Sequence, residues 1–246
     1  MYLPNMIRSK GEFKSADFYF YHGWAFPPGM WNSMINLVKT RLQDETGLQA
    51  DFMVNNRGYF SDPSAIVRMR QGDLHIVVTH SLGLHFVPVS LLHKADVLVS
   101  ISGFHGFHSI HGDQTRRIVE RMLSKIQESP GTVLQEFYKN VFHPSELPAN
   151  YLTDASNAYR LNRLIDDLQL LNENQISERI FPESCKILLY HGEQDRIVSA
   201  DHTRKWMMGM NQTSGRIVKD AGHALPVTHS DHIVSGIIKS IQRLTQ

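Results

Sequence analysis

Residues 73–90 read DLHIVVTHSLGLHFVPVS and contain the clearest structural signal in this 246-residue chain. The β-branched run at 76–78 predicts a buried strand over 74–79. The turn after this strand holds Ser81 and Gly83, and we expect a helix to leave it. A serine on such a strand-to-helix turn is held in a strained backbone conformation, with its hydroxyl projecting at the carboxyl end of the sheet.

A nucleophilic serine on this kind of turn usually stands in the pattern G-x-S-x-G. Gly83 supplies the second glycine, but Thr79 stands in place of the first. That position needs a small side chain because strand and helix crowd together there, and threonine is a modest departure. Taken alone, the stretch also fits a serine that caps an ordinary helix after a strand.

Short apolar strands alternate with helical stretches along most of the chain. We predict strands at 17–21, 52–54, 74–79, 95–101, 186–190 and 215–219, and helices near 30–42, 64–69, 200–210 and 231–244. This alternation predicts an α/β fold, in which a mostly parallel twisted sheet is covered by helices on both faces.

The pattern changes between the strands at 95–101 and 186–190. Three amphipathic stretches, at 116–127, 132–142 and 158–171, predict helices with no strand between them. A helical block of this length is too long for a simple crossover, so we interpret it as a cap over the active face. We therefore expect a single domain over 1–246 with a helical cap inserted at about 112–175.

Composition fits one soluble enzyme domain. The formal net charge is +1 with 20% charged residues, which does not favour nucleic acid as a partner. One cysteine, Cys185, excludes an internal disulfide and suits a reducing compartment. The first ten residues lack the apolar core of a signal peptide, and the apolar run at 95–101 is too short to span a bilayer. We expect a cytoplasmic monomer.

A second motif, His22-Gly23-Trp24, follows the aromatic strand at 17–21. A glycine at this point lets the backbone turn tightly, so that the Trp24 amide can point at a developing negative charge. This arrangement is typical of an oxyanion loop. The alternative is an ordinary loop between a strand and a helix.

Three residues with complementary chemistry occur in the order Ser81, Asp195, His223. Asp195 and His223 each follow a predicted strand, which places both at the same sheet edge as Ser81. A neutral serine needs an imidazole to remove its proton, and the imidazole needs a carboxylate to fix its tautomer. Asp201 is an alternative acid, but it lies inside the next predicted helix, which favours Asp195.

These motifs resemble the α/β-hydrolase superfamily over nearly the whole chain: H-G-W at 22–24, S-L-G at 81–83, G-E-Q-D at 192–195 and A-G-H-A at 221–224. The His-Gly-Trp loop and the stretch RRIVERM at 116–122 look more narrowly like the pimeloyl-acyl carrier protein methyl ester esterases of biotin synthesis. The resemblance implies that Trp24 and Leu82 shape the oxyanion and substrate site. Thr79 and the bulky residues at 84–86 depart from that family's pattern.

The same resemblance implies two roles for the first cap helix. Met122, Leu123, Ser124, Lys125 and Ile126 would contribute to the acyl channel. Arg117 and Arg121 would face the acidic carrier protein, since basic side chains on a cap steer an acidic partner toward the cleft. The alternative for both arginines is an ordinary solvated helix face.

The sequence thus predicts a serine carboxylesterase that needs no cofactor and acts on an acyl ester, and the resemblance implies that this ester is the methyl ester of pimeloyl-acyl carrier protein. Two alternatives remain open. The same triad would serve a short-chain carboxylesterase, thioesterase or lactonase that acts on a small free ester. A non-catalytic binding protein on the same scaffold is the third hypothesis. The 14 histidines show no HExxH or other metal-binding spacing, so we expect no metal site.

Overall fold

The structure is a computed structural model that describes residues 13–64, 69–149, 151, 159–209 and 212–245. Its strands are β1 (Ser15–Tyr21), β2 (Gln49–Asn55), β3 (Leu74–His80), β4 (Val97–Ile101), β5 (Lys186–Gly192) and β6 (Thr213–Val218). They form one sheet in the order β2-β1-β3-β4-β5-β6, with every neighbouring pair parallel. The predicted α/β fold class is therefore confirmed.

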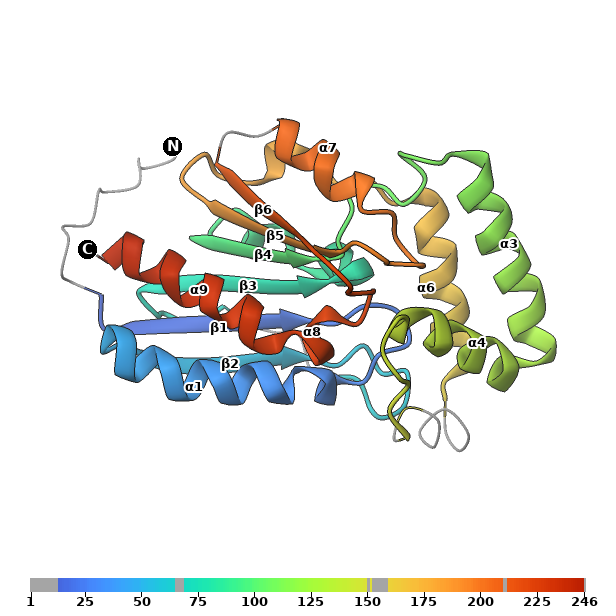
Figure 1. Cartoon of the computed structure of the whole chain (residues 1–246), viewed down its shortest axis with the longest axis horizontal. Helices are drawn as coiled ribbons and strands as arrows, with labels where there is room; N and C mark the ends of the chain where they lie inside the picture. Colours follow the sequence, from blue (N-terminus) through green and yellow to red (C-terminus); the bar gives the residue numbers. More distant parts are fainter. Residues whose placement is uncertain (1–12, 65–68, 150, 152–158, 210–211, 246) are drawn as a thin grey trace.

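Helices cover both faces of this sheet. The main elements are α1 (Asn32–Thr46), α2 (Val89–Leu92), α7 (Asp201–Gly209), α8 (Leu225–Thr228) and α9 (Ser230–Thr245), with a 3-10 turn η1 (Pro28–Trp31) before α1 and another, η3 (Glu178–Ile180), before β5. Figure 1 shows α1 and α9 lying side by side along the sheet. The expected helices near 30–42, 200–210 and 231–244 correspond to α1, α7 and α9. Residues 65–68 of the helix expected near 64–69 lie outside the described residues.

The two faces carry separate cores because successive strand residues point in opposite directions. Phe18 and Phe20 of β1 belong to the core beneath α1 and α9. Tyr19 and Tyr21, one position along, belong to a second core that includes Trp206 of α7. With both faces buried, the strands read as nearly continuous apolar runs, which explains the lack of a polar alternation in the sequence.

Three helices stand apart from these layers: α3 (Asp113–Glu128), α4 (Pro130–Phe142) and α6 (Leu161–Glu173). Figure 1 shows them grouped beyond the carboxyl ends of the strands, opposite the end where the chain termini lie. They correspond to the helices expected at 116–127, 132–142 and 158–171, of which Ala158 lies outside the described residues. Any group carried on the strand ends therefore faces these helices, which we call the cap.

The chain after Ser81 differs from the expected helix. A 3-10 helix, η2 (Ser81–Phe86), is followed by extended backbone at Val87 and only then by the four residues of α2. Pro88 explains the interruption, because it lacks a backbone N–H and disfavours helical conformation in the residue before it. The prediction of a helix leaving the turn was therefore wrong in form, although the turn itself is present.

Candidate active site

Ser81 begins its turn with the strained backbone that the sequence predicts. Its φ angle is 53°, in the left-handed region that non-glycine residues rarely occupy. The side chain is 7% exposed. Such strain at a single residue is typical of functional sites, where the surrounding structure holds the residue in place.

Two glycines make this turn possible by allowing close packing against it. A Cβ on Gly83 would overlap the backbone carbonyl of Tyr21, and a Cβ on Gly23 would lie 2.9 Å from Cβ of Ser81. Thr79, in contrast, is fully buried and tolerated, and its hydroxyl lies 3.4 Å from the carbonyl oxygen of Val99. The missing first glycine of the pattern thus leaves the turn intact.

Asp195 and His223 meet at the same sheet edge. His223 Nδ1 donates a hydrogen bond to Asp195 Oδ2 at 2.7 Å, and neither side chain is more than 1% exposed. The other carboxylate oxygen accepts backbone N–H groups from Ile197 and Val198 at 2.8 and 2.9 Å. Burial alone raises the pKa of Asp195, but the charge of His223 and hydrogen bonds from His191 and His223 outweigh it and hold the pKa well below its ordinary value. The carboxylate is therefore ionised.

With Nδ1 engaged by the acid, Nε2 is the nitrogen of His223 that remains for a serine. Within the described residues, no hydrogen bond joins Ser81 Oγ to His223. Bonds of this type are often long in free enzymes and tighten when substrate binds. His80, directly before Ser81, packs against His223. Its Nε2 lies 3.0 Å from the His223 carbonyl oxygen, and the ring centroids are 4.6 Å apart.

The His22-Gly23-Trp24 loop is fixed by its histidine. His22 Nδ1 lies 3.0 Å from the carbonyl oxygen of Gly23, and Nε2 accepts the backbone N–H of Arg57 at 3.1 Å. This pairing defines a neutral ring with its proton on Nδ1. Burial lowers the pKa of His22 to about 4, so the ring stays neutral at physiological pH.

Trp24 connects this loop to the cap. Its indole Nε1 donates a hydrogen bond to the carbonyl oxygen of Leu164 in α6 at 2.8 Å, and its ring packs edge-on against Phe137 of α4. The residue predicted to shape the oxyanion site therefore also holds two cap helices.

A second buried connection joins the loop after β2 to α6. The guanidinium of Arg57 forms a bidentate pair with Asp167 at 2.8 and 2.6 Å, and the Tyr59 hydroxyl donates to the same carboxylate at 2.6 Å. Asp167 is 1% exposed, so its charge depends on these two partners. This cluster is not visible in the sequence, because Asp167 lies more than 100 positions from both Arg57 and Tyr59.

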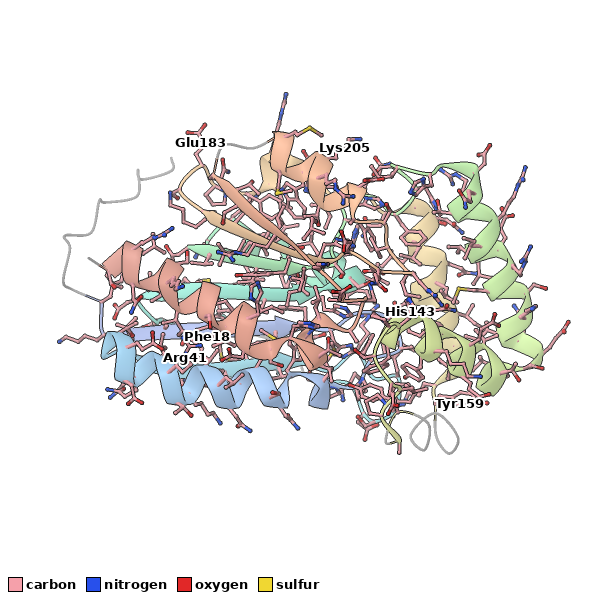
Figure 2. All side chains as sticks on the ribbon, in the orientation of Figure 1. Phe18, Arg41, His143, Tyr159, Glu183 and Lys205 are labelled. Carbon is pink, nitrogen blue, oxygen red and sulfur yellow. The ribbon has the colours of Figure 1, made fainter. Side chains whose placement is uncertain are left out.

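The cap also touches the loop that carries His223. The backbone N–H of Ala224 donates to the carbonyl oxygen of Val141 in α4 at 3.1 Å. A Cβ on Gly222 would overlap the carbonyl oxygen of His143, so this position requires glycine. Figure 2 labels His143 where the end of α4 meets the rest of the fold. The cap thus packs directly on the backbone on both sides of His223.

A cavity of about 350 Å³ lies between Ser81 and the cap. Its walls are mostly apolar. Charged side chains line it at three positions on the cap, and a fourth, Arg196, follows Asp195 in the sequence. The lining residues are Trp24, Ser81, Leu82, Phe104, Phe107, Thr115, Ile118, Val119, Arg121, Met122, Lys125, Val133, Glu136, Phe137, Asn140, Leu168, Leu171, Arg196 and Ile197. This composition suits an apolar acyl group with a polar or charged neighbour.

The cap residues singled out from the sequence fall into different places on α3. Met122 and Lys125 line the cavity, as does Arg121. Leu123 is half-buried, Ile126 is fully buried in the core, and Ser124 is exposed. Arg117 is exposed on α3 and does not line the cavity. Only part of the predicted channel segment can therefore contact a ligand here.

Other predicted features have simpler surroundings. Asp201, the alternative acid, is exposed and pairs with Arg204 at 2.8 Å. Among the described residues, no group of three or more His, Cys, Asp or Glu side chains is arranged to hold a metal ion. No helix in the described part of the chain is both long and apolar enough to cross a membrane.

No protein-family model matches the sequence, and no curated protein is significantly similar to it. Solved structures do match in fold. An esterase from Exiguobacterium antarcticum aligns with a TM-score of 0.75 at 14% identity, over 94% of this chain and 93% of that one. An esterase from Thermogutta terrifontis aligns with 0.71 at 14% identity, over 95% and 92%. A bromoperoxidase from Bacillus anthracis aligns with 0.69 at 15% identity, over 95% and 94%.

These likenesses, together with the parallel sheet and the cap, define the class: the chain has the α/β-hydrolase fold. At such low identity they define the fold alone, and the chemistry rests on the residues described above.

Proposed function

We propose that this protein is a serine ester hydrolase in which Ser81 is the nucleophile and His223 the general base. The carboxylate of Asp195 orients His223 and stabilises its protonated form. The observation that carries the proposal is the 2.7 Å hydrogen bond between His223 and an ionised Asp195, at the same sheet edge as a serine with φ of 53° that lines a mostly apolar cavity. Two of the matching structures are named as esterases, which is consistent with this chemistry.

The proposed reaction has two halves. His223 Nε2 removes the proton of Ser81 as the hydroxyl attacks the ester carbonyl, and the resulting imidazolium is stabilised by Asp195. The backbone amides of Trp24 and Leu82 would hold the oxyanion. The imidazolium then protonates the leaving alcohol, and a water activated by His223 releases the acid and restores the serine.

A fluorophosphonate probe tests the nucleophile directly. Such a probe should label the folded protein at Ser81, as located by peptide mass, and Ser81→Ala should abolish the labelling. A folded wild-type protein that is not labelled would favour the third hypothesis, a binding protein on this scaffold.

For the substrate, we propose the methyl ester of pimeloyl-acyl carrier protein. The apolar cavity matches an acyl chain, and Arg121 at its wall with Arg117 outside it on α3 would attract an acidic carrier. The resemblance of the sequence motifs to pimeloyl esterases supports the same choice. A small free ester hydrolysed without a carrier is the second candidate, because the cavity of about 350 Å³ can hold such a molecule without a protein partner.

Charge reversal separates these two substrates. Arg117→Glu should weaken hydrolysis of the carrier-linked ester, and added salt should weaken it in the wild type, with little effect on free methyl pimelate. Arg243→Glu, at an exposed position on α9, is a matched control that should leave both reactions unchanged. An equal loss of activity on both substrates in Arg117→Glu would contradict recognition of the carrier protein. A complementation experiment tests the substrate in vivo. If the gene for this protein restores growth without biotin to cells that lack their own pimeloyl esterase, the proposed substrate is supported.

A further inference from the structure

His191 is a buried histidine beside the acid that the reaction above does not use. It is the next-to-last residue of β5, and its side chain has no exposed surface. Its Nε2 lies 2.9 Å from the carbonyl oxygen of Val198 and 3.2 Å from Oδ2 of Asp195. Its Nδ1 lies 2.8 Å from the hydroxyl of Thr203 in α7.

These partners determine where the ring carries its proton. Both groups near Nε2, the Val198 carbonyl and the Asp195 carboxylate, can only accept hydrogen bonds. Nε2 must therefore bear a proton, which it shares between the two acceptors. The Thr203 hydroxyl can donate to Nδ1, so a neutral ring satisfies all the contacts at once.

The carboxylate oxygen that His191 Nε2 approaches is Oδ2 of Asp195. Asp195 Oδ2 is also the atom that accepts the proton of His223 Nδ1 at 2.7 Å. Two imidazole N–H groups therefore share one carboxylate oxygen, while Oδ1 is held by backbone amides. A donor on a carboxylate withdraws part of its negative charge, so it weakens the hold of that carboxylate on an imidazolium.

We propose that His191 is a positioning residue, oriented by Thr203, which fixes Oδ2 of Asp195 and moderates the basicity of His223. This inference rests on the proposed function for its consequence in catalysis, but the effect on His223 exists whether or not the protein turns over an ester. The polar chain Thr203, His191, Asp195, His223 then extends the triad by two residues into the fold.

The other titratable groups around these four polar side chains do not donate a hydrogen bond to Asp195. His80 faces His223 from the end of β3, His22 lies beyond it on the loop after β1, and His202 faces His191 from α7. Burial is the main cause that lowers the pKa of all three. They are therefore neutral at physiological pH, and His191 is the described side chain other than His223 that donates to Asp195.

The test is an NMR titration of the His223 ring in Ser81→Ala protein, with two substitutions at 191. His191→Leu keeps the volume but removes the donor. His191→Gln places an amide N–H where Nε2 stood. We expect His191→Leu to raise the pKa of His223 by about 0.5 to 1 pH unit, and His191→Gln to restore most of the original value. With Ser81 present, the acid limb of kcat/KM should move upward by the same amount in His191→Leu.

An unchanged pKa of His223 in folded His191→Leu protein would overturn the proposal, as would equal shifts in the Leu and Gln variants. If His191→Leu does not fold, Thr203→Val carries the same comparison, because it removes the hydroxyl that orients the ring; a smaller upward shift is expected and no shift would overturn the proposal. The titration needs no turnover. A shift in an inactive protein would therefore contradict the proposed function and leave this inference standing.

Discussion

The indole nitrogen of Trp24 donates a hydrogen bond to the backbone carbonyl oxygen of Leu164, at 2.8 Å. The two residues are 140 positions apart, one on the loop after β1 and the other in α6 of the cap. Through this bond, the loop proposed to hold the oxyanion and the cap that encloses the cavity behave as one unit. The cap therefore contacts the candidate active site directly and is not a separate cover.

Trp24→Phe tests this connection. Phenylalanine keeps an apolar ring against Phe137 but removes the indole N–H, and we expect about 1 kcal/mol less stability. Exchange of backbone amides in α6 should become faster, and kcat for ester hydrolysis should fall because the oxyanion loop is held less firmly. Unchanged amide exchange in α6 together with unchanged kcat would contradict the proposed connection.

The Arg57–Asp167 pair should contribute more to stability. Asp167→Ala leaves Arg57 without its buried partner, and the loss of a buried pair by removing one side costs about 3–5 kcal/mol. Because Arg57 is partly exposed, the lower part of that range is expected. Urea unfolding provides the measurement. Tyr59→Phe, which removes a single hydrogen bond to the same carboxylate, is the matched control and should cost about 1 kcal/mol; a larger loss in Tyr59→Phe than in Asp167→Ala would refute this ranking.

Gly83 should tolerate no side chain. A Cβ there would overlap the backbone carbonyl of Tyr21, and neither strand nor turn can move without displacing Ser81. We expect Gly83→Ala to lose most soluble, folded protein. Gly131→Ala in α4, where an added Cβ has open space around it, should fold normally and gain up to about 1 kcal/mol. Normal expression and melting temperature of Gly83→Ala would show that the close approach is not needed.

Stability should fall on mild acidification because of buried neutral histidines. Burial lowers the pKa of His22, His85, His105 and His202 to about 4. Between their unfolded pKa of about 6.5 and this value, the unfolded chain binds more protons than the folded one, so each histidine makes the free energy of unfolding fall by about 1.4 kcal/mol per pH unit. This stability is fully present above pH of about 6.5 and is lost as the pH falls toward 4. Melting temperatures measured from pH 7.5 to 4.5 should decline steadily, whereas a constant value over that range would be inconsistent with neutral burial.

The strands and their parallel arrangement could be predicted from the sequence because strand signals are local, whereas the order of the strands in the sheet could not. Short β-branched or aromatic runs bounded by turn residues mark each strand, and both faces being buried explains why these runs lack alternation. Pro88 is visible in the sequence in the same way, and it prevents a continuous helix after Ser81. The turn motif predicts only the backbone at Ser81, whereas the conformation that follows depends on this proline.

The surroundings of the site were less accessible from sequence. Order along the chain pointed to Ser81, Asp195 and His223, but the roles of His191 and Asp167 depend on contacts between distant elements. For His191 a signal exists, since it lies four positions before Asp195, near the end of the strand that precedes this residue. For Asp167 there was none, because an acidic residue on an amphipathic helix is normally solvated.

Every step of the proposed reaction depends on the hydroxyl of Ser81. The most direct measurement is kcat/KM for a simple methyl ester with wild-type and Ser81→Ala protein. Equal melting temperatures of the two proteins would show that both are folded. We expect measurable hydrolysis by the wild type and a loss of several orders of magnitude in the variant, because a general base without its nucleophile retains little activity. Hydrolysis by Ser81→Ala at near the wild-type rate would contradict this role of Ser81.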